Sequence, residues 1–314
     1  MFGAGAVGGI IIDADDETRR RAIRTAVDAG INWIDTAASY GQGRSEEALG
    51  WLLKELSDDE QPYLSTKFSV DPEQGDIPGQ IEQSIGESLT RLNRASIDVF
   101  QLHNRVSESR GWFPGSIAVD DVLGRAGVAE GLQRLVDQGL TRYIGFTATG
   151  ESSAIHKVIA SERFDSAQVY YNILNPSAGR AVPGGAKAYN FDNLIDACQT
   201  HGVAVMNIRV LAAGVIATDV RHGREVPVAP GADVSMDESS TRMLVEALGN
   251  SHGTRAQLAV RYALSNPNVS GVLVGMAELD HLDLALGAQE LGPLPDEVLK
   301  RIHALVDTDY GRLG

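Results

Sequence analysis

Short apolar runs rich in β-branched residues alternate along the chain with longer segments whose apolar residues recur at helical spacing. Several of the short runs are apolar at nearly every position, which is typical of parallel strands buried on both faces. The pattern predicts strands over residues 31–35, 63–67, 97–103, 142–147, 167–171, 203–209 and 269–274. It predicts helices over residues 16–29, 45–56, 77–92, 128–138, 152–161, 193–201, 254–265, 278–287 and 297–306. A first strand is expected within residues 1–6.

Eight successive strand–helix units predict an α/β fold, a (β/α)8 TIM barrel with a closed parallel sheet and outer helices. A doubly wound open sheet is the alternative. No linker rich in Pro, Gly or Ser divides the chain, so residues 1–314 are expected to form a single barrel domain. The long connections 104–125, 172–189 and 212–235 all follow strands. They are therefore expected on the carboxyl-terminal face, where enzymes of this fold carry their active sites.

A glycine-rich stretch, Gly3-Ala4-Gly5-Ala6-Val7-Gly8, matches the fingerprint of a dinucleotide-binding Rossmann unit. That fingerprint needs a full strand before it and a helix that opens at its third glycine. Only two residues precede the stretch, and the helical pattern begins near Asp16. We therefore favour the glycine-rich end of a first barrel strand, with backbone close to a ligand.

The composition limits the kinds of binding partner that the protein can have. With 43% hydrophobic residues, the 314-residue chain is typical of a globular protein. The formal charge of −15 opposes binding to nucleic acid or to an anionic membrane surface. Cys198 is the single cysteine, so no intramolecular disulfide can form and a cytoplasmic location is expected. The expected partner is a small molecule, and the sequence leaves the oligomeric state open.

Four chemically suited residues follow three successive predicted strands. Asp35 ends one strand and Tyr40 follows it by five positions, while Lys67 and His103 end the next two strands. A free tyrosine titrates near pH 10 and gives up its proton reluctantly, but a nearby ammonium group favours the phenolate. Lys67 can supply that charge, Asp35 can hold Lys67, and His103 can share a proton or orient a substrate oxygen. The set predicts proton transfer to a carbonyl oxygen as a hydride arrives, or the reverse.

Taken one at a time, the same residues have purely structural interpretations. Asp35 could cap a turn, and Tyr40 could be an aromatic residue at the edge of the barrel. Lys67 could be a surface charge, and His103 could be a histidine whose hydrogen bonds are all made within the fold. It is their succession at neighbouring strand ends that favours a catalytic site.

With these residues in place, the chain resembles an aldo-keto reductase. The resemblance rests on Asp35-Thr36-Ala37-x-x-Tyr40-Gly41, Ser65-Thr66-Lys67 and Gln101-Leu102-His103, together with Glu87-Ser88-Leu89-x-Arg91-Leu92, Ile144-Gly145-Phe146, Gln168-Val169-x-Tyr171-Asn172 and Leu211-Ala212-x-Gly214. It implies a NAD(P)(H)-dependent oxidoreductase that reduces an aldehyde or ketone, or oxidises the matching alcohol or sugar. Tyr40 would be its general acid/base, assisted by Lys67, Asp35 and His103.

The resemblance also implies a cofactor site. Thr147 and Gln168 would bind the nicotinamide carboxamide, and Gly275 begins the segment that meets the adenosine phosphate end. The loop over the pyrophosphate corresponds to Arg209, Leu211 and Gly214. Members of the family usually carry an N-terminal hairpin beneath the barrel. The sequence therefore leaves undecided how the floor of the barrel and its first strand are formed.

Two alternatives remain at this stage. NADP is the first choice of cofactor because the family commonly uses it. Glu278 and Asp280 follow Gly275 and would repel a 2′-phosphate, so NAD is the alternative. Some members of the family serve as cofactor-binding regulatory subunits with little or no turnover. Retention of Asp35, Tyr40, Lys67 and His103 favours an enzyme.

Overall fold

The computed structural model describes residues 1–5, 7–184, 189–221, 223, 231, 233–249 and 251–312. The chain divides into two compact units. Unit 1 comprises Met1–Gln168, Thr200–Ala204 and Gly275–Leu282. Unit 2 comprises Val169–Gln199, Val205–Val274 and Asp283–Gly314. Whether the chain is a single domain, as expected, stays a prediction.

Unit 1 is built on parallel strands that pair in the order of the chain. They are β1 (Phe2–Gly3), β2 (Trp33–Asp35), β3 (Tyr63–Phe68), β4 (Ile97–Leu102) and β7 (Thr141–Ala148). The register sets Asp35 opposite Ser65, and Lys67 opposite Gln101. Since neighbouring parallel strands present matched residues on the same face, this register gathers their polar side chains.

The hydrogen-bonded strand order is β10-β9-β8-β7-β4-β3-β2-β1-β11, with β8 at Ser166–Tyr170, β9 at Ala204–Ile208, β10 at Gly271–Val272 and β11 at Val274–Gly275. The order follows the chain without the reversal that a doubly wound sheet requires. Its two ends, β10 and β11, belong to one short segment, residues 271–275. Strand topology therefore agrees with a closed barrel rather than with the open-sheet alternative.

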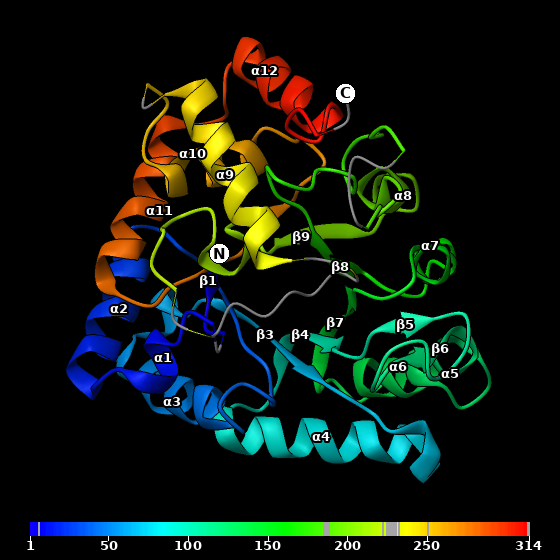
Figure 1. The fold of residues 1–314 in the computed structure, drawn as a ribbon. Coiled ribbons are helices and arrows are strands. Elements are labelled where there is room, and N and C mark those ends of the chain that lie inside the picture. The colour runs from blue at the N-terminus through cyan, green and yellow to red at the C-terminus, as the bar shows by residue number, and fades with distance from the viewer. Residues whose placement is uncertain are drawn as a thin grey trace. The chain divides into compact units, whose positions relative to one another are not determined.

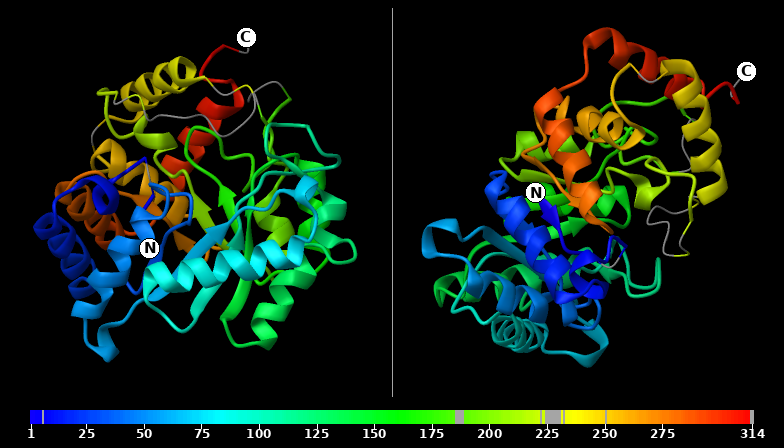
Figure 2. Two further views of the ribbon diagram at one scale, coloured as in Figure 1. Left: turned by 90° about the horizontal axis from the view of Figure 1, so that it is seen from below. Right: turned by 90° about the vertical axis from the view of Figure 1, so that its left-hand side faces the viewer.

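Helices of unit 1 follow its strands. They are α1 (Ile10–Asp13), α2 (Asp16–Asp28), α3 (Arg44–Leu52), α4 (Ile77–Leu92), α5 (Val119–Leu123), α6 (Val128–Asp137) and α7 (Ser152–Ala160), with short 3-10 turns η1 (Leu53–Glu55), η2 (Asp58–Glu60) and η3 (Pro72–Gln74). Contacts link α3 to α4 and α4 to α6, and the left view of Figure 2 shows α4 crossing in front of the strands. The packing face of α4 consists of buried Ile77, Ile81 and Ile85, spaced by four residues as an amphipathic helix requires.

Unit 2 carries β10 and all but the first residue of β9, which pair in parallel, and all but the last residue of α8 (Leu194–Thr200). It also carries η4 (Ala212–Gly214), α9 (Val234–Leu248), α10 (Arg255–Leu264) and α12 (Asp296–Asp307). Helix α11 (Leu279–Leu291) has residues in both units. A two-pronged ion pair joins Arg180, after β8, to Asp307 at the end of α12, at 2.8 and 3.0 Å. Figure 1 labels β9 and the helices α8 to α12.

Most predicted elements are present, with ends shifted by a few residues. Three features of the structure were not predicted. Residues 10–13 form a short helix that was not expected, and α9 was missed altogether. Connection 104–125 contains β5 (Val106–Ser107), β6 (Ile117–Ala118) and α5 instead of being purely loop.

The glycine-rich stretch begins at Gly3, the last residue of the two-residue strand β1, and the next helix, α1, has only four residues, so the stretch does not form a Rossmann unit. A Cβ on Gly8 would lie 2.4 Å from the carbonyl oxygen of Met276, so the residue is glycine because two backbones meet there. Ala6, and residues 185–188, 222, 224–230 and 232 in the two later long connections, lie outside the described part of the chain.

Candidate active site

Asp35 lies at the end of β2 and is almost fully buried, at 1% exposure. Its Oδ1 accepts hydrogen bonds from Ser65 Oγ at 2.7 Å, Gln168 Nε2 at 2.6 Å and Gln101 Nε2 at 3.3 Å. Its Oδ2 accepts from Lys67 Nζ at 2.5 Å. A buried carboxylate is costly unless it is paired and hydrogen-bonded, and here both oxygens are occupied by donors.

Lys67 is the last residue but one of the neighbouring strand, β3, and is also buried. Besides Asp35, its Nζ contacts the carbonyl oxygen of Thr36 at 2.7 Å and the hydroxyl of Tyr40 at 3.3 Å. Burial by itself lowers the pKa of Lys67, but the charge of Asp35, followed by the interaction with Tyr40, raises that pKa above its ordinary value. The side chain is therefore an ammonium group, held against the phenol.

Tyr40 is held by the turn between β2 and α3. Ala38 continues the strand pairing through a backbone bond to Lys67, and the Tyr40 N–H bonds to the Ala37 carbonyl at 3.0 Å. The turn reaches α3 through Gly43, whose φ of 93° favours glycine. A Cβ there would lie 2.9 Å from Cδ of Arg91, so a larger residue would also collide with α4.

His103 follows β4, and its backbone N–H bonds to the carbonyl of Phe68 at 2.7 Å. Its ring stands edge-on to that of Tyr40, with centroids 5.7 Å apart and planes at 81°. Nδ1 lies 3.4 Å from Ser39 Oγ. Burial, and to a smaller extent the charge of Lys67, lowers the pKa of His103 to about 3. The imidazole is consequently neutral at physiological pH.

The residues predicted for a cofactor divide between the units. Thr147 ends β7 and donates its hydroxyl to the Leu102 carbonyl at 3.1 Å, while Gln168, on β8, contacts Asp35 in the same unit. No atom lies within 4 Å of the position a Cβ would take on Gly275. The backbone of Gly275 is thus open to an approaching group.

Arg209, Leu211 and Gly214 belong to unit 2. The loop has positive φ at Arg209 (61°), Ala212 (47°), Ala213 (59°) and Gly214 (98°). Three of these residues are not glycine, and such strained backbone persists where the surroundings or a function require it.

Ser65 and Gln101 stand in two of the motifs described above, but the sequence analysis assigned neither residue a role. Side chains alternate along a strand, so Ser65 shares a face with Lys67, and Gln101 shares one with His103. That spacing of two was the available signal. Both residues are buried and both donate to Asp35.

Glu46, near the start of α3, was also overlooked. It is fully buried, and its carboxylate accepts from Thr66 Oγ1 at 2.5 Å and from Arg91 Nε at 2.7 Å. Thr66 precedes Lys67 on β3, and Arg91 lies in the last turn of α4. Glu46 therefore links α3, α4 and β3 next to the predicted catalytic residues.

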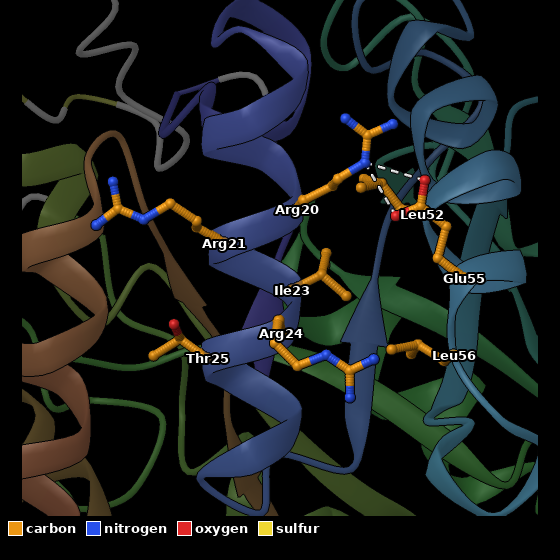
Figure 3. A pocket seen from close by; sticks show the side chains of 8 residues that line it. All are labelled: Arg20, Arg21, Ile23, Arg24, Thr25, Leu52, Glu55 and Leu56. Carbon is orange, nitrogen blue, oxygen red and sulfur yellow. Dashed lines mark hydrogen bonds and ion pairs between the residues drawn. The ribbon is translucent and has the colours of Figure 1, made fainter.

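A separate hollow of about 360 Å³ lies between α2 and the end of α3 (Figure 3). It is lined by Arg20, Arg21, Ile23, Arg24, Thr25, Leu52, Glu55 and Leu56. Arg20 is paired with Glu55 at 3.0 Å, and Arg24 with Glu60 at 2.5 Å. Because acidic partners offset these two cations, the hollow is not a strongly basic site.

Among the residues that the structure describes, no helix is both long and apolar enough to span a membrane. In the same residues, no group of three or more His, Cys, Asp and Glu side chains could hold a metal ion.

Comparison with known proteins identifies the family. The sequence profile of the Aldo/keto reductase family matches residues 1–307. L-galactose dehydrogenase of Arabidopsis thaliana is 25% identical over 98% of this chain and 89% of its own length. An aldo-keto reductase from Bacillus halodurans, in its holo form, superimposes with a TM-score of 0.73 at 23% identity, covering 97% of this chain and 90% of the other.

An aldo-keto reductase from Klebsiella pneumoniae in complex with NADPH gives a TM-score of 0.67 at 22% identity, over 98% of this chain and 90% of that one. These likenesses confirm the predicted (β/α)8 barrel fold. The profile match, which spans nearly the whole sequence, confirms the resemblance drawn from the strand-end motifs and the expectation of an oxidoreductase. The chain belongs to the aldo/keto reductase family.

Proposed function

We propose that this protein is a NADP-dependent oxidoreductase that reduces an aldehyde or ketone, or oxidises the matching alcohol or sugar, with Tyr40 as general acid/base. The observation that carries the proposal is the buried Lys67 ammonium, 2.5 Å from Asp35 and 3.3 Å from the Tyr40 hydroxyl. A cation at this distance stabilises the negative charge that develops on the phenol oxygen as its proton leaves. Tyr40 can therefore both release and recover a proton.

In the direction of reduction, the Tyr40 hydroxyl gives its proton to the substrate oxygen, and Lys67 stabilises the phenolate that is left. In the reverse direction, the phenolate takes the proton of the alcohol. Asp35 keeps Lys67 in place and does not touch the substrate. A nicotinamide cofactor, when bound, supplies or accepts the hydride.

His103 has a different part. With its pKa lowered to about 3, it is neutral through the physiological range and is a poor candidate for the acid. A neutral imidazole has one N–H donor and one acceptor nitrogen. We propose that His103 donates a hydrogen bond to the substrate oxygen and so orients it toward Tyr40.

The residues proposed to hold the cofactor are Thr147, Gln168 and Gly275 in unit 1, with Arg209, Leu211 and Gly214 in unit 2. Gln168 uses one amide hydrogen on Asp35, which leaves a second N–H and a carbonyl oxygen suited to a carboxamide. The open space beside Gly275 fits a close approach of phosphate. On these grounds Gln168 suits the carboxamide and Gly275 suits a phosphate of a dinucleotide.

NADP is our first choice because the Klebsiella relative was solved with NADPH. Glu278 and Asp280 are exposed after Gly275 and favour NAD to a degree, because carboxylates repel a 2′-phosphate. Michaelis constants for NADPH and NADH, measured with the same substrate, decide between the two cofactors. We expect the lower constant for NADPH, and a large advantage for NADH contradicts the choice.

The test of the overall proposal is a panel of aldehydes, ketones, alcohols and sugars, assayed in both directions with both cofactors by absorbance at the nicotinamide band. We expect turnover with at least one carbonyl compound. Cofactor binding without turnover of any compound would instead support the alternative of a regulatory subunit. The panel also identifies the substrate, which the fold alone does not fix.

A further inference from the structure

A chain of hydrogen bonds runs along the sheet to the candidate acid. The indole Nε1 of Trp33 donates to Ser65 Oγ at 3.0 Å, and Ser65 Oγ donates to Asp35 Oδ1 at 2.7 Å. Asp35 Oδ2 is bonded to Lys67, and Lys67 to Tyr40. All five residues belong to unit 1.

Strand geometry explains this arrangement. Trp33 and Asp35 are two residues apart on β2, and Ser65 and Lys67 are two apart on β3, so each pair shares a face. The parallel register sets Asp35 opposite Ser65. The Trp33 indole is steadied from the side by the ring of Tyr63, with centroids 5.6 Å apart.

The direction of these hydrogen bonds is fixed by chemistry. An indole nitrogen can only donate, and an ionised carboxylate can only accept. Ser65 accepts the Trp33 N–H with one of its two lone pairs, and its single hydroxyl hydrogen goes to Asp35, which can only accept. The bond from Trp33 restrains the Ser65 side chain in the position from which it donates to the carboxylate.

We propose that Trp33 and Ser65 are positioning residues that orient and stabilise the Asp35 carboxylate, and through it set the strength with which Lys67 acts on Tyr40. The inference rests on the proposed function, since it assigns how the acid of that reaction is tuned. Neither residue was given a role in the site by the sequence analysis, although Ser65 stands in one of the motifs that carry the resemblance.

The expected effect follows from the charge on Asp35. Removal of the Ser65 hydroxyl leaves two amide donors on Oδ1, so the carboxylate becomes more basic and draws the Lys67 proton more strongly. Less positive charge then acts on Tyr40, and its phenolate forms less readily. In alcohol oxidation, where the phenolate is the base, the rate should rise at a higher pH than in the wild type.

Four variants test the proposal in the complete protein. Ser65→Ala should lower kcat for alcohol oxidation about 10-fold, the scale of one lost hydrogen bond to a charged group, and move the acid limb of the pH–rate profile upward. Ser65→Thr keeps the hydroxyl and should restore the profile. Trp33→Phe should produce a smaller shift in the same direction. Tyr63→Phe is the matched control and should leave the profile unchanged, because its hydroxyl takes no part in the chain of hydrogen bonds.

A double variant tests whether the two residues act in series. If Trp33 acts only through the hydroxyl of Ser65, Trp33→Phe should have no further effect on kcat or on the profile once Ser65→Ala is present. Additive effects, or a Ser65→Ala profile that matches the wild type, overturn the proposal. So does a Trp33→Phe profile that is shifted no more than that of Tyr63→Phe.

A readout in the cofactor-free protein separates this inference from the proposed function. The indole N–H resonance of Trp33, assigned by its loss in Trp33→Phe, should move upfield and exchange faster with solvent in Ser65→Ala than in Ser65→Thr. An unchanged resonance contradicts the hydrogen-bond chain even if the enzyme turns over. Absence of wild-type turnover on the substrate panel defeats the proposed function instead, and leaves the resonance test standing.

Discussion

At the residue scale, the buried pair of Asp35 and Lys67 dominates the site. The sequence was sufficient to predict that Asp35 pairs with Lys67, because both end neighbouring strands and carry opposite charge. It was not sufficient to predict that Ser65, Gln101 and Gln168 all donate to Asp35, since donor partners depend on side-chain rotamers. Gln168 was expected to bind a carboxamide, and its contact with Asp35 was not foreseen.

Lys67→Met tests this pair. The substitution leaves the Asp35 carboxylate buried without its cation, and loss of one member of a buried ion pair typically costs about 3–5 kcal/mol. We expect a loss of that order in the free energy of unfolding, measured with urea, together with loss of turnover. The double variant Asp35→Asn/Lys67→Met removes both charges and should recover much of the stability but none of the activity. A double variant that is less stable than Lys67→Met contradicts the interpretation.

The stability of the folded protein should depend on pH because of His103. Its pKa is about 3 in the folded protein and near 6.5 in an unfolded chain, so between these values only the unfolded state takes up the proton. Stability should therefore fall as the pH decreases from about 6.5 towards 3. His103→Gln removes this contribution. Urea unfolding at pH 7 and pH 4.5 should give a smaller stability difference for the variant, and equal differences contradict the assigned shift.

At the element scale, α3 and α4 are joined closely beside the turn that holds Tyr40. The buried Glu46 carboxylate on α3 binds Arg91 on α4, and a Cβ on Gly50 would lie 2.2 Å from the Arg91 carbonyl oxygen. The two helices can approach this closely because residue 50 has no side chain. The approach also supports the turn through Gly43, which contacts the Arg91 side chain.

Gly50→Ala measures how much this close approach contributes. The new methyl group meets backbone atoms, so α3 must move away from α4, and we expect a destabilisation of about 1–3 kcal/mol, typical of overpacking. The matched control is Gly86→Ala, within α4, where no atom lies within 4 Å of the added carbon. There the better helix propensity of alanine should raise stability by about 1 kcal/mol. Thermal unfolding compares the two, and destabilisation of equal size would refute the steric explanation.

Elements with regular apolar spacing were predictable, and those with polar buried positions were not. Helix α4 begins and ends where predicted because Ile81, Ile85 and Leu92 mark its packing face. Helix α9 was missed since its buried positions include Ser240 and Thr241, which weaken the apolar pattern. The short β5 and β6 depend on pairing between distant residues, and two-residue strands leave no periodic signal.

At the scale of the whole molecule, the alternation of strands and helices was enough to predict a barrel, and the succession of strand-end residues was enough to predict its family. The same alternation gives no information on the substrate, because the long connections that follow the strands have no repeating pattern. The net charge of −15 works against long-range attraction of an anionic cofactor, so binding must rest on local groups.

The most direct test of the account is Tyr40→Phe. The substitution removes the hydroxyl that lies 3.3 Å from Lys67 and keeps the aromatic ring. Turnover of the best substrate from the panel should be abolished, while the dissociation constant for NADPH, measured by fluorescence titration, should change less than about twofold. A variant that keeps a rate near that of the wild type contradicts the assignment of Tyr40 as the acid, and with it the proposed mechanism.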